Sequence, residues 1–218
     1  MNLPNIKDND NFKALDTAWA IEQLRRASTP TDAVTLIQTL SSKNLTAVDR
    51  NDIITALIEM LNHHHPTVPA AAVEALTKLA PDSVELLIAA FHASKDHGLQ
   101  AYIVQTLAKI GDDRALDLLL EVIGVAVANH CQGNVRRVAA RGLAPIATNS
   151  NNPEVIQRIL EKLTWALEKT EDWALRYAAA VSLQEIATID AITALQKAAI
   201  EEQDSVVQVR IKTALESL

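Results

Sequence analysis

The same pattern of apolar and polar positions returns several times along the chain. It first spans residues 68–80 and recurs at 99–111, 135–147 and 175–187, with a shorter copy from residue 207. Apolar residues stand four residues before and three residues after a constant leucine, a spacing that places them on one face of an α-helix. The leucines are Leu76, Leu107, Leu143, Leu183 and Leu215. Each copy therefore predicts one helix with one buried face.

The column beside this buried face holds small or β-branched residues, which allow neighbouring helices to pack closely without leaving a cavity. These residues are Val73, Val104, Ala140 and Ala180. Successive copies start 31, 36, 40 and 32 residues apart, a period typical of two-helix solenoid units.

The segments between the copies predict the partner helices. They span residues 83–91, 114–123, 154–167 and 191–200, with Asp113, Pro153 and Asp190 near the last three starts. Weaker patterns predict helices at 31–40, where Asp32 stands near the start, and at 52–62. The expected fold is all-α, a right-handed α-solenoid of about five two-helix repeats. We expect one domain over residues 16–218, preceded by a flexible arm at 1–15.

Composition supports this fold and excludes some functions. Apolar residues make up 49% of the chain and aromatic residues 3%, with 5 glycines, which favours helix over sheet. A net charge of −7 argues against nucleic-acid binding, which needs a dominant positive surface. The lone cysteine fits a reducing compartment, and neither a signal peptide nor a membrane span is expected. These features predict a cytoplasmic protein that does not act at a membrane.

The segment from Asn129 to Asn134 is the first candidate for chemistry, because it joins the only cysteine to a histidine just before a basic helix. We expect Asn134 to cap that helix, whose free amides would favour a Cys131 thiolate. His130 beside it would serve as acid or base. The alternative is a small apolar cysteine packed under a loop beside a hydrogen-bonded histidine.

Arginines and aromatic residues follow this segment. Arg137 and Arg141 are four residues apart and share a helical face suited to a carboxylate or phosphate. Arg136 and its repeat equivalent Arg176 are expected to pair with acidic loop residues for structure. The aromatic pair Trp173 and Tyr177, beside Asp172, would offer a flat wall to a conjugated ligand or would fill the core at a repeat junction. Trp19 and Trp165 are expected to be packing residues.

Other chemistry is not indicated. His63, His64 and His65 stand in a predicted loop, where three consecutive side chains cannot all face one ion, so no metal site is expected. The chain has no phosphate-binding glycine loop and no hydrolase motif.

The hexapeptide Asn-His-Cys-Gln-Gly-Asn, followed by Val-Arg-Arg-Val-Ala-Ala-Arg-Gly-Leu and set among HEAT-like repeats, resembles the F-type subunit of the cyanobacterial E/F phycobilin lyases. The resemblance covers residues 68–218. It implies a heterodimer with an E-type subunit that attaches phycocyanobilin to a cysteine of a phycobiliprotein α subunit through a thioether. It also implies that phycocyanobilin is a substrate, with no cofactor permanently bound.

The resemblance further implies roles for individual residues. In the isomerising branch of the family, which makes phycoviolobilin on phycoerythrocyanin, His130 and Cys131 would shift a double bond. Alternatively, Cys131 would add reversibly to the pigment and hold it during transfer. The chemistry of the residues themselves suits such a pigment, because it presents two propionates, a conjugated face and pyrrole N–H groups. The residues expected to contact it are Asn129, Gln132, Asn134, Arg137, Arg141, Asp172, Trp173 and Tyr177. Attachment without isomerisation stays open, as do a non-catalytic adaptor for phycobiliproteins and an interaction module unrelated to pigments.

Overall fold

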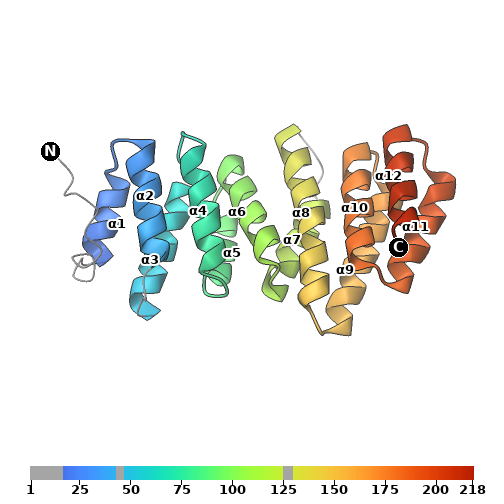
Figure 1. Ribbon diagram of the computed structural model, residues 1–218, viewed down its shortest axis with the longest axis horizontal. Helices are drawn as coiled ribbons and strands as arrows, with labels where there is room; N and C mark the ends of the chain where they lie inside the picture. The colour runs from blue at the N-terminus through green and yellow to red at the C-terminus, as the bar shows by residue number, and fades with distance from the viewer. Residues whose placement is uncertain (1–16, 43–46, 125–129) are drawn as a thin grey trace. The chain divides into compact units, whose positions relative to one another are not determined.

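The computed structural model describes residues 17–42, 47–124 and 130–218, and of Ala47, Val48, His130, Cys131 and Gln132 it describes the backbone alone. All regular elements in these ranges are helices (Figure 1), which confirms the all-α prediction. Backbone contacts divide the chain into two compact units, Met1–Ser83 and Val84–Leu218. The predicted arm at 1–15 lies outside the described residues, and the single domain over 16–218 stays a prediction.

The N-terminal unit contains four helices: α1 (Thr17–Arg25), α2 (Pro30–Ser41), α3 (Ala47–Met60) and α4 (Thr67–Lys78). The last three match the helices predicted at 31–40, 52–62 and 68–80, whereas α1 lies where no helix was predicted. Thr29 caps α2, since its hydroxyl accepts from the Asp32 amide at 3.1 Å and donates to the Asp32 carboxylate at 2.7 Å. Helices α2 and α3 both pack against α4.

The C-terminal unit contains the remaining helices. They are α5 (Ser83–Ala93), α6 (His97–Ile110), a 3₁₀ turn η2 (Asp113–Ala115), α7 (Leu116–Gly124), α8 (His130–Asn149), α9 (Pro153–Lys169), α10 (Trp173–Ile186), α11 (Ile189–Glu201) and α12 (Ser205–Glu216). Figure 1 shows α8 between α6 and α10, and it packs against both. The alternation of repeat helix and partner helix agrees with the prediction.

The predicted buried columns are confirmed in this unit. Three columns are inaccessible in its full copies: the leucine column, the apolar column four residues before it, and the column of small or β-branched residues. Their members in these copies are Ile103, Val104, Leu107, Ala139, Ala140, Leu143, Ala179, Ala180 and Leu183. The column three residues after the leucine is less uniform, because it lies at the helix ends. Ile146 is buried, Ile110 and Ile186 are half-buried, and Leu218 is 47% exposed, so the prediction was wrong for Leu218.

Aspartate caps recur in a column that the sequence reasoning overlooked. Asp96, Asp172 and Asp204 accept from the first free amides of α6, α10 and α12, each three residues before the start of the repeat pattern. Among the partner helices, Asn152 caps α9 and Pro153 follows as its first residue. The caps before α7 and α11 are Asp112 and Thr188, so Asp113 and Asp190 lie inside the turn and the helix respectively. Within the described residues, no helix combines the length and apolarity that a membrane crossing requires.

Candidate functional site

Helix α8 begins inside the hexapeptide, at His130. Asn134 is therefore an exposed residue of the second turn, and the prediction that it caps the helix was wrong. The physical reason lies in the cap column, where α6, α10 and α12 have aspartate and α8 has Gln132. Glutamine is a poor cap, so nothing in the side chain stops the helix from extending upstream. Residues 130–133, which were expected to precede the helix, thus belong to it.

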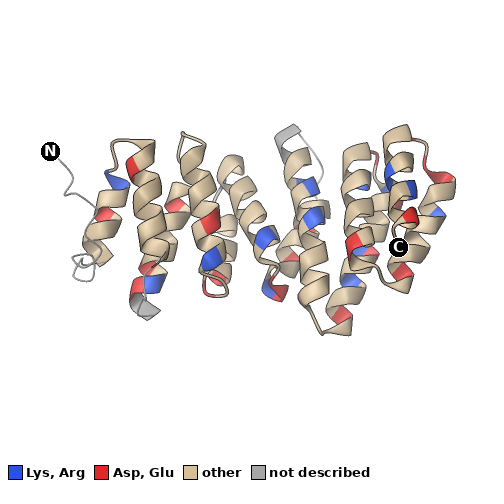
Figure 2. Cartoon of the chain, in the orientation of Figure 1, with Lys and Arg blue, Asp and Glu red and all other residues tan. Residues whose placement is uncertain are grey.

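The structure leaves the two predicted catalytic side chains undescribed. Asn129 lies outside the described residues, and for His130, Cys131 and Gln132 the backbone alone is placed. Cys131 stands in the first turn of α8, where free amides concentrate partial positive charge. Two basic stretches follow along the same helix (Figure 2). The catalytic roles of His130 and Cys131 stay predictions.

Arg137 and Asp172, two predicted bilin-binding residues, meet across α8 and α10. The Arg137 Nη2 atom donates to both carboxylate oxygens of Asp172 at 3.2 Å, and Nε donates to Oδ2 at 3.4 Å. The same carboxylate accepts from the amides of Ala174 and Leu175, which caps α10. Asp172 thus fixes the start of α10 against the basic part of α8.

Arg141 makes a second connection between these helices. Its Nη2 donates to Glu185 at 2.6 Å and its Nη1 to the Ser182 hydroxyl at 3.4 Å. The buried Ser182 hydroxyl in turn donates to the carbonyl of Ala140 at 2.9 Å. Arg137 and Arg141 therefore already hold α8 to α10, with their guanidinium groups still partly accessible.

The aromatic pair lies on the surface beside this ion pair. Trp173 is 48% exposed and Tyr177 is 37% exposed, one turn apart at the start of α10. This exposure favours a flat aromatic surface for a conjugated ligand over the filling of the core at a repeat junction. Trp19 and Trp165 are also exposed, at 42% and 39%, so the prediction that they are packing residues was wrong.

Arg136 takes a role different from the one predicted. It donates Nε to the carbonyl of Ile123 at 2.9 Å instead of pairing with an acidic loop residue. Burial, opposed by the charge of Asp172 and assisted by that of Arg137, lowers the pKa of Arg136. On α9, the Lys162 ammonium lies 4.5 Å from the centre of the Trp165 ring. Sequence reasoning missed Lys162, although its spacing of three residues from Trp165 within a predicted helix indicates a shared face.

Arg176 behaves as predicted. It forms a forked ion pair with Glu202, at 2.8 and 3.0 Å, with the two side chains 15% and 5% exposed. It also donates to the carbonyls of Thr170 and Glu171, at 2.9 and 3.0 Å.

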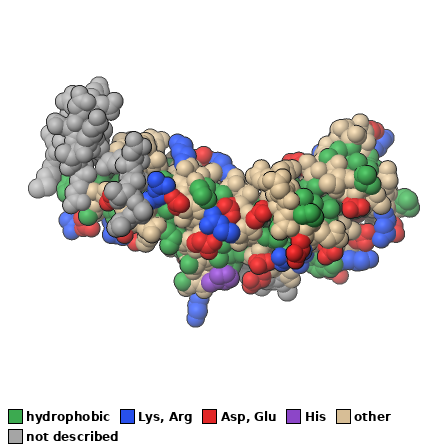
Figure 3. All heavy atoms as spheres, turned by 90° about the horizontal axis from the view of Figure 1, so that it is seen from below, with side chains coloured by type: hydrophobic (Ala, Val, Ile, Leu, Met, Phe, Trp, Pro, Cys, Tyr) green, Lys and Arg blue, Asp and Glu red, His purple; other side chains and the backbone are tan. Residues whose placement is uncertain are grey.

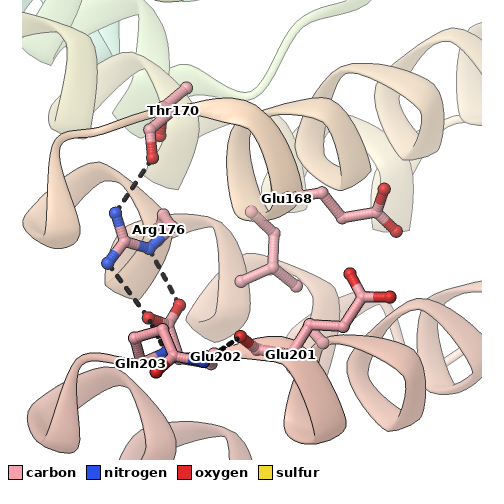
Figure 4. Close-up of a pocket in the computed structure, with 8 residues that line it drawn as sticks. Glu168, Thr170, Arg176, Glu201, Glu202 and Gln203 are labelled. Atoms are coloured by element: carbon pink, nitrogen blue, oxygen red, sulfur yellow. Dashed lines mark hydrogen bonds and ion pairs between the residues drawn. The ribbon is translucent and has the colours of Figure 1, made fainter.

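This ion pair lines a cavity of about 270 Å³ between the end of α9, α10 and the end of α11. Figure 4 shows the carboxylates of Glu168 and Glu201 on the side away from the pair. Glu168 is paired with Lys197 at 2.9 Å. The cavity is therefore lined by charges that are largely satisfied within the chain.

The described residues offer no ready metal site. No three described His, Cys, Asp or Glu side chains converge where they would hold an ion. His63 and His64 stack at 4.3 Å in the predicted loop, and His65 bonds to the Thr67 hydroxyl at 2.8 Å. Figure 3 shows one face of the C-terminal unit, on which acidic, basic and apolar side chains are mixed.

Comparisons with known proteins agree with the repeat pattern. The HEAT-repeat family matches residues 54–128 and 124–216. A bilin biosynthesis protein PecF of Nostoc sp. is 60% identical over 164 residues, covering 75% of this chain and 95% of the relative. PecF of Mastigocladus laminosus is 53% identical over 200 residues, covering 91% and 93%. Among solved structures, the complex of CpcE and CpcF of phycocyanin lyase from Nostoc sp. contains a chain that matches with a TM-score of 0.65 and 30% identity, covering 74% of this chain and 96% of that one.

Proposed function

The chain belongs to the HEAT-repeat bilin biosynthesis proteins of the PecF type, and we propose that it is the F-type subunit of a heterodimeric phycobilin lyase. With an E-type partner it attaches phycocyanobilin to a cysteine of a phycobiliprotein α subunit. The observation that carries this proposal is the high identity to two PecF proteins over nearly their full lengths.

The bilin is a substrate that leaves with the product, and no permanently bound cofactor takes part. The acceptor thiol adds across a carbon–carbon double bond of the pigment, which forms one C–S bond and one C–H bond. Nothing is oxidised or released, so the subunits have to bind both reactants, orient them and move one proton. We place this reaction in the cytoplasm.

The exposed surface of α8 and α10 supplies the bilin contacts. The flat faces of Trp173 and Tyr177 receive the conjugated pigment. Asp172 accepts from pyrrole N–H groups, and Arg137 offers a propionate the Nη1 edge that Asp172 does not occupy. Arg141, whose guanidinium group is bound by Glu185 and Ser182, adds positive potential.

His130 and Cys131 carry the isomerisation to phycoviolobilin. Moving a double bond requires removal of a proton at one carbon and its return at another, which an imidazole and a thiol in one helical turn would share. Asn129, Gln132 and Asn134 bind the pigment around them.

Reconstitution tests the function. We expect that this chain, an E-type subunit, an apo-α subunit and phycocyanobilin together yield a pigment that stays on the α subunit after denaturation in acid. Omitting this chain should abolish that adduct. An equal yield without this chain would make it an adaptor and refute the lyase proposal.

The absorption spectrum of the denatured product tests the two residues. We expect wild-type chain to give the phycoviolobilin spectrum, and His130→Ala and Cys131→Ala to give phycocyanobilin adducts instead. If both variants still give phycoviolobilin at the wild-type rate, the assignment of His130 and Cys131 is wrong while attachment stands.

A further inference from the structure

Lys162, Trp165 and Arg136 form a second cluster of the C-terminal unit, where α7, α8 and α9 pack together. Lys162 and Trp165 share a face of α9, and the ammonium lies 4.5 Å from the indole centre. A Cβ atom placed on Gly124, the last residue of α7, would lie 3.0 Å from the same ammonium. Arg136 reaches this region from α8 through its 2.9 Å bond to the Ile123 carbonyl. Three helices thus bring two cations together, one of which lies over the ring of an exposed tryptophan.

Among the described residues, the two cations lack the acidic partner that four arginines of this unit have. Arg137, Arg141, Arg158 and Arg176 each pair with an aspartate or glutamate. Neither Lys162 nor Arg136 forms an ion pair with any carboxylate in the described parts of the chain. Asp172, whose charge acts on Arg136, is already bound by Arg137 and by two amides of α10.

The electrostatics of the cluster favour an added anion. Burial lowers the pKa of Lys162, and the charge of Arg136 lowers it further. The cost of holding two like charges in a partly buried place falls when a carboxylate binds between them. Trp165 is 39% exposed, so part of its side chain beside Lys162 stays open to the apolar contact that a conjugated ring system needs.

We propose that Lys162 and Arg136 bind a carboxylate whose attached conjugated body lies against Trp165. The site rests on the proposed function, in which this carboxylate is a propionate of the tetrapyrrole. Arg136 and its neighbour Arg137 point about 100° apart around α8. One propionate therefore binds on the α9 side of the helix, and the other binds on the α10 side.

Binding of phycocyanobilin and of its dimethyl ester to the complete complex with an E-type subunit tests this site, with absorbance as the readout. The variant is Lys162→Met, and the matched control is Lys169→Met, which removes the same charge from the same helix at an exposed position. We expect Lys162→Met to weaken binding of the diacid about tenfold, since a charge-assisted bond is lost. The ester should bind wild type and Lys162→Met equally, and Lys169→Met should match wild type with both ligands.

Three outcomes overturn the site. Diacid affinity equal to wild type in Lys162→Met would remove the lysine from binding. Equal weakening for diacid and ester would show that the variant damages the fold and does not remove a carboxylate contact. Both results leave the proposed function standing if the adduct still forms. A wild-type complex that binds neither ligand and forms no adduct refutes the proposed function, and the site falls with it.

Discussion

Replacing Gly142 by alanine should loosen the contact between α6 and α8. Gly142 is buried in the middle of α8, and a Cβ atom there would overlap the Ala108 Cβ atom of α6. It would also lie 2.7 Å from the Ala108 Cα atom and 3.2 Å from Leu119 Cδ1. Carbon atoms prefer separations of roughly 3.5–4.0 Å. Because the first two of these atoms belong to backbone or are fixed to it, the helices have to separate by about 1 Å.

The magnitude follows from two opposing effects. Overpacking a buried site costs roughly 1–3 kcal/mol and sometimes more. Alanine recovers up to about 1 kcal/mol because it favours helix and restricts the unfolded chain. With backbone in the clash, we expect overpacking near the upper end and a net loss of about 2 kcal/mol. For a chain of this size that loss lowers the melting temperature by roughly 4–8 °C.

Thermal and urea unfolding followed by circular dichroism measure this effect. Gly98→Ala is the matched control, because its Cβ meets the Asp96 carboxylate at 3.1 Å and no other atom closely. We expect this control to be at least as stable as wild type, because alanine favours helix and only the Asp96 carboxylate has to shift. If Gly142→Ala unfolds at the same temperature and urea concentration as Gly98→Ala, the inferred close approach of α6 and α8 is wrong.

Three further predictions concern the last two repeats. Glu202→Gln should cost about 3 kcal/mol in urea unfolding, because it leaves Arg176 charged and poorly compensated in a shielded site; a loss below about 1 kcal/mol would contradict this. Burial raises the pKa of Glu202, but hydrogen bonds from Arg176 and from backbone amides outweigh it and hold that pKa below the ordinary glutamate value. When the pKa of a carboxyl group is lower in the folded than in the unfolded protein, its ionised form adds to the free energy of unfolding. This contribution is complete above the unfolded pKa and is lost as the pH falls through the folded pKa. As the pH is lowered from about 5 to about 3, the urea midpoint of wild type should therefore decrease more than that of Glu202→Gln. Equal decreases in the two proteins would refute the role of the Glu202 carboxylate. Ala187, at φ 54°, ends α10 in the left-handed region, so Ala187→Gly should raise stability by roughly 0.5–1 kcal/mol in the same assay, and a loss would contradict the strain.

The repeat helices were predictable because burial imposes a period on the sequence. The constant leucine and the small residues beside it mark the buried face of each copy, and the structure buries Leu107, Leu143 and Leu183 completely. Helix α1 was missed because it lies before the first copy and shares none of these columns. The start of α8 was misplaced because the reasoning considered Asn134 alone and overlooked the aspartate column in which α8 has Gln132.

The candidate site was predictable in membership but not in pairing. Residue types and spacing selected Arg137, Arg141 and Asp172, and the structure brings all three to the contact of α8 and α10. Their partners depend on packing between residues 35 and 44 positions apart in the chain, which local pattern cannot supply. The spacing of Lys162 from Trp165 was readable in the sequence, but its nearness to Arg136 on another helix depends on packing in the same way.

The central claim is that the surface of α8 and α10 contacts the pigment during attachment. The direct measurement is the rate of covalent adduct formation by the reconstituted complex containing Trp173→Leu with Tyr177→Leu, compared with Trp19→Leu. Trp19 is a fair control, because its exposure of 42% is close to the 48% of Trp173 and it lies in the other unit. We predict at least a tenfold slower reaction for the double variant, since each lost aromatic contact is worth roughly 1 kcal/mol, and the wild-type rate for Trp19→Leu. A double variant that attaches phycocyanobilin as fast as the Trp19→Leu control would contradict the account.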